Sequence, residues 1–223
     1  MNGQASASPR IEAPAPGACE IVALFRNRPI GHETAQIETD GPDGLCVRAV
    51  TEIATPRFPV TQMAVMRYDA GLRPRGCTVE GFVNGRPLAL EVEIGAARAT
   101  IRSRFDDRER TGAIEISRPP LLLLDNCFVS HVLAALAAAR GAPDEAPYLS
   151  LPSGGEMPIT RGGAGPVRLG GAESPPPSLT LHLAPGLDEH AWIAEGRVER
   201  LLIQQAHLRI ECPNNTTPPG GHP

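Results

Sequence analysis

Cys127 and His131 are the two side chains whose types and spacing come closest to a catalytic arrangement. They lie four positions apart in a segment predicted to be helical, so both belong to one face, about 6 Å apart at Cβ. The dipole near the start of a helix favours a thiolate at Cys127. The pair is therefore the candidate for catalysis. The alternative is that Cys127 is a small core residue and His131 a buried, hydrogen-bonded histidine, and this alternative is favoured because free cysteines are so often simply buried.

Asp125 is a weaker candidate for chemistry. It lies six positions before His131, which places the two on different sides of a helix. A direct Asp–His pair is therefore not expected. Asp125 or Asn126 is instead predicted to cap the N-terminus of the helix, where these residue types are preferred.

Arginines gather on one predicted strand and just beyond it, at Arg98, Arg102, Arg104, Arg108 and Arg110. Because arginine binds phosphate with two parallel hydrogen bonds, these arginines are candidates for binding a phosphate or the anionic head group of a ligand. Acidic residues alternate with them, however, which favours an ordinary solvated face. We therefore expect this face to be exposed and to contribute little to stability.

The histidines of the predicted closing strands follow no spacing that would fix a metal ion, so no metal site is predicted. These residues are His182, His190 and His207.

The composition excludes several classes of function. All 21 basic residues are arginine, so Schiff-base chemistry and a P-loop lysine are impossible. A net charge of −4 and few aromatic residues (Phe 5, Tyr 2, Trp 1) argue against a nucleic-acid surface. The cysteines form no Cys-x-x-Cys pair, which is compatible with reduced thiols. With no secretory signal and no apolar run of about 18 residues, we expect a cytoplasmic protein without an integral membrane segment or cofactor.

Most of the sequence alternates between apolar and polar residues, as antiparallel strands do. Asn84-Gly85 is a strong hairpin signal, and its register pairs Val79 with Leu90. A second turn at Ala96-Ala97 pairs Val92 with Ile101. Both registers place the apolar residues on the same face, as a sheet with one buried side requires.

One segment, Leu121–Arg140, is predicted to be a long buried helix because it lacks alternation and turn residues and is apolar almost all round. We expect it to pack on the sheet face that carries Val79, Leu90 and Val92. The predicted organisation is a single domain over 19–212 with a Gly/Pro-rich loop at 152–178. Residues 1–18 and 213–223 are predicted to be disordered.

The order of these elements resembles a known group of proteins. The sequences FRNRPIGHET (Phe25–Thr34) and WIAEGRVERLLI (Trp192–Ile203) resemble parts of the lipoprotein carriers LolA and LolB and of related glycolipid-binding families. The resemblance spans residues 19–211. It implies a mainly β fold in which a curved antiparallel half-barrel wraps around one central α-helix, with an apolar cavity for acyl chains.

The sequence therefore predicts a non-enzymatic carrier or binding protein for an apolar or amphipathic, lipid-like ligand held between sheet and helix. An isomerase or cyclase of the same shape, using His131 and Cys127 for acid–base work, is the alternative. A filled core with an exposed sheet edge, acting as an interaction protein, is a third reading. The candidate ligand-binding residues are Val79, Leu90, Val92, Ile101, Phe128, Val132 and Leu136.

Overall fold

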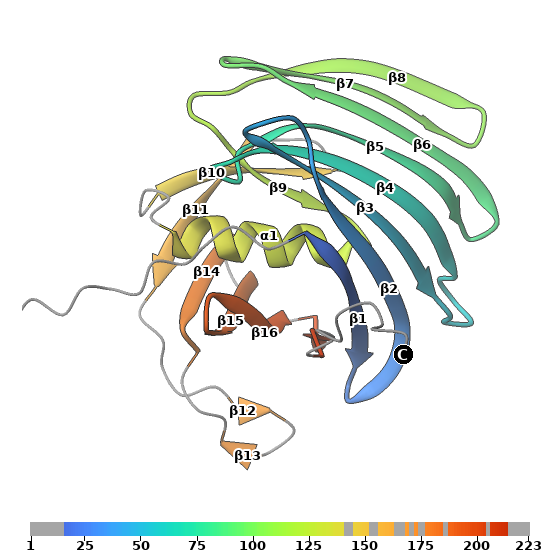
Figure 1. The fold of residues 1–223 in the computed structure, drawn as a ribbon. Helices are drawn as coiled ribbons and strands as arrows, with labels where there is room; N and C mark the ends of the chain where they lie inside the picture. Colours follow the sequence, from blue (N-terminus) through green and yellow to red (C-terminus); the bar gives the residue numbers. More distant parts are fainter. Residues whose placement is uncertain are drawn as a thin grey trace, which may run out of the picture.

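The computed structural model describes residues 16–140, 145–151, 156–162, 168–169, 172–173, 177–184, 187–203 and 206–213. Its first half is an antiparallel meander in which each strand pairs with the next (Figure 1). The strands are β1 (Gly17–Phe25), β2 (Arg28–Thr39), β3 (Gly44–Ile53), β4 (Val60–Asp69), β5 (Pro74–Val83), β6 (Arg86–Ile94), β7 (Arg98–Phe105) and β8 (Arg108–Glu115). Buried and exposed residues alternate along most of them, so the sheet has one buried face.

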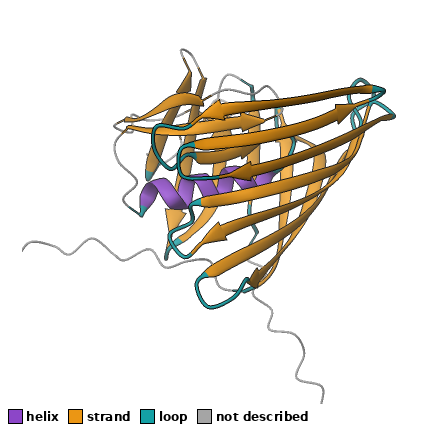
Figure 2. Ribbon diagram, turned by 90° about the horizontal axis from the view of Figure 1, so that it is seen from above, coloured by secondary structure: helices purple, strands orange, loops and turns teal. Residues whose placement is uncertain are grey.

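The later strands extend the same sheet from its other side, because β17 pairs with β1. They are β9 (Leu121–Leu124), β10 (Glu145–Leu151), β11 (Glu156–Gly162), β14 (Leu179–Ala184), β15 (Leu187–Ala194), β16 (Arg197–Ile203) and β17 (Leu208–Glu211). The resulting order is β8-β7-β6-β5-β4-β3-β2-β1-β17-β16-β15-β14-β11-β10-β9. Figures 1 and 2 show the curvature of this large sheet. It is not closed, since β8 and β9 are its two edges among the described strands.

The registers predicted for the central hairpins are confirmed. Val79 pairs with Leu90, and Val92 pairs with Ile101. Asn84 and Gly85 both have positive φ, 53° and 72°, as a type I′ turn requires. The turn chemistry and the burial pattern thus agree on the buried face of β5, β6 and β7.

The arginine face of β7 is exposed, as predicted. The Arg102 side chain is 67% exposed, and its guanidinium lies 3.4 Å from the Glu91 carboxylate on β6.

Replacing Arg102 and Arg104 with glutamine is expected to cost less than about 1 kcal/mol each in the free energy of unfolding, because exposed pairs are screened by water. Urea denaturation measures this, and a loss of several kcal/mol would contradict it.

The helix predicted over Leu121–Arg140 is shorter than expected. Leu121–Leu124 forms β9, which pairs in parallel with β10, and α1 spans Phe128–Ala139. A run of four leucines has no periodicity that separates a buried strand from a buried helix. The positive φ of Asn126, 60°, turns the chain between the two elements.

The predicted cap of the helix is also wrong. The N-cap position is Cys127, which makes no side-chain cap hydrogen bond. Neither Asp125 nor Asn126 occupies that position, because the chain is still turning out of β9 at these residues.

α1 is buried along most of its length, in agreement with its alanine-rich, apolar composition. Its main neighbours are β9, β16, β1, β2 and β14. Val79, Leu90 and Val92 lie on the buried face of the same sheet, on β5 and β6, and belong to the same hydrophobic core as the helix. The strands directly beside the helix are others, however, because β1 pairs with β17 and the later strands continue the sheet from there.

The segment 152–178, predicted as a loop, contains strands. β11 pairs with both β10 and β14, while β12 (Arg168–Leu169) and β13 (Ala172–Glu173) form a separate two-stranded ribbon. Its many Gly and Pro residues hid this pattern, and the remainder of the segment lies mostly outside the described residues. The predictions for 1–18 and 213–223 fall almost entirely outside them too, although β1 already begins at Gly17.

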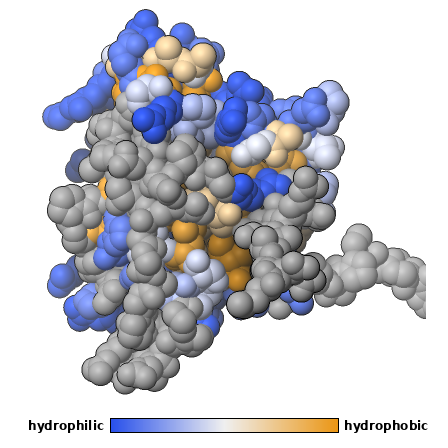
Figure 3. Space-filling model, turned by 90° about the vertical axis from the view of Figure 1, so that its left-hand side faces the viewer, coloured by the Kyte–Doolittle hydropathy of each residue, from blue (hydrophilic) through white to orange (hydrophobic). Residues whose placement is uncertain are grey.

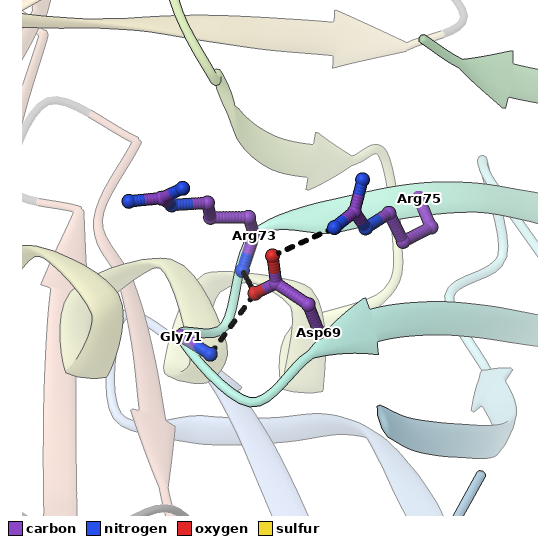
Figure 4. A network of polar contacts seen from close by, with 4 residues as sticks. All are labelled: Asp69, Gly71, Arg73 and Arg75. Atoms are coloured by element: carbon purple, nitrogen blue, oxygen red, sulfur yellow. Dashed lines mark hydrogen bonds and ion pairs between the residues drawn. The ribbon is translucent and has the colours of Figure 1, made fainter. Parts of the chain in front are cut away.

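The turn between β4 and β5 is held by one carboxylate (Figure 4). Asp69 Oδ1 accepts hydrogen bonds from the backbone amides of Gly71 and Arg73, each at 2.9 Å. Its Oδ2 accepts from the Arg75 guanidinium at 3.1 Å. This network fixes a turn in which Leu72 has a φ of 60° while its side chain is buried. The network therefore stabilises the turn of this hairpin.

Hydrophobic residues also occur on the surface, among hydrophilic ones, as Figure 3 shows for one face. The large hydrophobic side chains that are exposed among the described residues are Phe25, Val50, Phe58, Met63, Phe82 and Phe105. Exposed hydrophobic residues that cluster are candidates for binding, whereas scattered ones need no explanation.

Candidate functional site

An apolar pocket lies where the β1–β2 turn, the β3–β4 loop and the first turns of α1 meet. Its volume is about 530 Å³, within the range of roughly 300–1,000 Å³ that is typical of small-molecule sites. The lining residues are Phe25, Ile30, Ile53, Thr55, Pro56, Arg57, Phe58, Asn126, Phe128, His131 and Leu208. Apolar side chains thus dominate the pocket, with a few polar groups among them.

Two phenylalanines remain exposed in this pocket. Phe25 is 41% exposed at the end of β1, and Phe58 is 43% exposed in the β3–β4 loop. The loop is ordered by its own hydrogen bonds, since the amide of Phe58 donates to Thr55 Oγ1 at 3.0 Å and that of Ala54 to the Ile30 carbonyl at 2.8 Å. Leaving aromatic rings in water costs free energy that a bound apolar molecule would recover.

His131 lines the pocket and is hydrogen-bonded to a buried acid, Glu189. Its Nδ1 lies 2.9 Å from Glu189 Oε2, and the Glu189 side chain is 0% exposed. The other carboxylate oxygen, Oε1, has no hydrogen-bond partner among the described residues. The pair fixes the imidazole ring, so that Nε2 is the nitrogen left to meet a ligand.

The charge state of His131 follows from two opposing effects. Burial lowers the pKa of its imidazole, but the charge and hydrogen bond of Glu189, together with the charges of Asp125 and Glu33, outweigh burial and raise it above its ordinary value. The pair therefore favours an imidazolium. Because the pKa is raised on folding, its contribution to stability is complete below the unfolded value of about 6.5 and is lost as the pH rises through the folded pKa.

Glu189→Gln should lower the pKa of His131. The substitution removes the largest of the charges that raise this pKa and leaves the burial that lowers it. An NMR titration of the imidazole in the wild type and the variant measures both values. An unchanged midpoint in Glu189→Gln would show that the ion pair does not form in solution.

A second buried acid, Glu33 on β2, holds the start of the helix. Its Oε1 accepts from the amide of Val129 at 2.6 Å, and its Oε2 from the amide of Phe128 at 3.0 Å and the hydroxyl of Thr51 at 2.5 Å. Burial raises the pKa of Glu33, although these hydrogen bonds act in the opposite direction. Glu33 thus provides from a neighbouring strand the cap that α1 lacks in its own sequence.

Cys127 is fully buried beside this cap. Burial and the charge of Glu33 raise the pKa of its thiol well above the ordinary value. This direction is opposite to the thiolate that its place near the helix start suggested. Cys127 is also absent from the pocket lining, so the two members of the predicted pair lie in different surroundings.

The structure places the predicted ligand-binding residues in different surroundings. Phe128 lines the pocket. The other six do not: Val79, Leu90, Val92 and Leu136 are buried in the core, and Ile101 and Val132 are half-buried.

Sequence reasoning missed Glu33, Glu189 and the two exposed phenylalanines as site residues. Glu33 had a signal, because it shares the inward face of β2 with Ala35 and Ile37, and a carboxylate on a buried face needs partners. Glu189 had no such signal, since its contact with His131 joins residues 58 positions apart.

Comparison with known proteins adds a distant structural similarity. The sequence matches no protein-family model and none of the curated proteins. A similar solved structure is that of a beta-barrel-like protein of domain of unknown function DUF1849 from Brucella abortus. It is 8% identical in sequence, with a TM-score of 0.43 over 92% of this chain and 96% of that chain. None of the helices in the described ranges has the length and apolar character to cross a membrane.

Proposed function

We propose that this protein is a binding protein or carrier for an apolar or amphipathic, lipid-like molecule, built as a half-barrel around α1 like the lipoprotein carriers that its sequence resembles. The supporting observation is the pocket with Phe25 and Phe58 exposed in it. Covering the exposed part of one such ring on binding is worth about 1 kcal/mol.

The pocket does not lie where the sequence predicts the ligand site. The inward faces of β5 and β6 contribute buried side chains to the common core, while the pocket lies at the start of the helix. The proposed ligand therefore enters beside the β3–β4 loop.

Nile red, an uncharged dye that fluoresces in apolar surroundings, tests this proposal. The folded protein should bind it at one site and show a saturable rise in fluorescence. Absence of binding at every concentration below the solubility limit of the dye would overturn the proposal and leave an interaction protein.

His131 gives a specific reason to keep an enzymatic alternative. Its ring lines the pocket and is oriented by Glu189 at 2.9 Å, an arrangement suited to moving a proton at Nε2. We propose an isomerase or cyclase acting on a hydrophobic substrate as this second candidate. Native mass spectrometry would identify any compound bound to the purified protein. That compound, incubated with the protein in D₂O, should incorporate deuterium with the wild type and not with His131→Gln. Recovery of an unlabelled compound favours the carrier.

A further inference from the structure

We propose that the molecule bound in the pocket is an amphiphile with an anionic head group, such as a carboxylate, and that His131 and Arg57 bind this head. This inference rests on the proposed binding function and specifies the chemistry of the ligand. It predicts the orientation of the bound ligand: the apolar tail covers the phenylalanines, and the head group contacts the two cationic side chains.

The polar part of the pocket lining is cationic. Its polar residues are Thr55, Arg57, Asn126 and His131, and no Asp or Glu is among the lining residues. Arg57 is exposed and forms no ion pair with the described residues that surround it. A neutral ligand would use neither charge, whereas a carboxylate would form charge-assisted hydrogen bonds with both.

The acids near His131 are engaged elsewhere. Glu189 is hydrogen-bonded to Nδ1, and Glu33 is hydrogen-bonded to two helix amides and Thr51. Asp125 is exposed and lies outside the pocket lining. These three carboxylates favour the imidazolium, and none of them occupies the pocket where the head group would lie.

The helix N-terminus is not the anion site. Its dipole attracts anions, but Glu33 already accepts hydrogen bonds from the amides of Phe128 and Val129 at 3.0 and 2.6 Å. The head group is therefore assigned to side chains. The β3–β4 loop presents Arg57 directly before Phe58, so one loop supplies both a cation and an apolar contact.

Three probes with the same chain test the inference: dodecanoate, dodecanol and dodecylamine, each measured by displacement of Nile red. Dodecanoate should bind at least about tenfold more tightly than dodecanol, as expected for one charge-assisted hydrogen bond, and dodecylamine should bind most weakly. Equal displacement by all three, or tightest binding of the amine, would overturn the anionic head while leaving the binding function intact. If Nile red itself does not bind, the proposed function fails and this inference with it.

Arg57→Gln provides the matched variant, because Arg57 is exposed and its loss should not affect folding. It should weaken dodecanoate about tenfold and leave dodecanol unchanged. Arg104→Gln, which removes an exposed arginine from β7, is the control and should change neither affinity. Equal affinities of the two variants for dodecanoate would contradict the assignment.

Discussion

Replacing Glu33 with alanine is expected to destabilise the protein by at least about 3 kcal/mol. The substitution leaves the amides of Phe128 and Val129 and the hydroxyl of Thr51 without their acceptor at a site where Glu33 is only 1% exposed. Each buried donor without a partner costs roughly 1–3 kcal/mol. The first turn of α1 would lose its cap, and the pocket residues that this turn carries would lose their support.

Glu38→Ala is the matched control for this prediction. Glu38 lies on the same strand, but its side chain is 50% exposed and its partner Arg48 is 3.7 Å away at the surface. Its removal should cost less than about 1 kcal/mol. Urea denaturation compares the two variants, and equal stabilities would show that Glu33 does not hold the helix.

Replacing Phe25 and Phe58 together with serine is expected to weaken binding of Nile red by at least about tenfold. Each ring is already more than half buried, so covering the rest of it contributes about 1 kcal/mol, and each 1.4 kcal/mol is a factor of ten in affinity. Both rings are partly exposed, at 41% and 43%, so the double variant should fold. A fluorescence titration measures the loss.

Phe82→Ser controls for the general loss of surface hydrophobicity. Phe82 is 56% exposed on β5 and is not a pocket residue. Its replacement should leave Nile red affinity unchanged. If the double variant binds as tightly as Phe82→Ser, the dye occupies another site and the pocket is not the binding site.

The fold could be predicted where local signals were strong. Asn84-Gly85 fixed the register of β5 and β6 because its turn type requires positive φ at both residues. The four leucines before the helix could not be assigned from pattern alone, and their strand depends on β10, which follows the helix in sequence. The sequence patterns therefore defined the meander well and the boundary of the helix poorly.

The candidate site was predicted only in part, for a similar reason. His131 was singled out by its spacing from Cys127, yet its partner is Glu189 on a distant strand. Phe128 was expected to contact a ligand and does line the pocket. Leu208 reaches the pocket because β17 pairs with β1, while Ile30 and Ile53 are brought together by the pairing of β2 with β3. Such contacts between distant segments have no periodic signature in the sequence.

Photo-crosslinking with a fatty acid that carries a diazirine in its chain would locate the binding site on the protein. The probe reacts with whatever side chain it touches, and mass spectrometry of the peptides identifies that residue. We expect labelling of the β3–β4 loop around Phe58 and of the strand ends that carry Phe25 and Leu208. Excess dodecanoate should suppress it. Labelling confined to β5 and β6, or labelling that excess dodecanoate does not reduce, would show that the pocket does not bind the fatty acid.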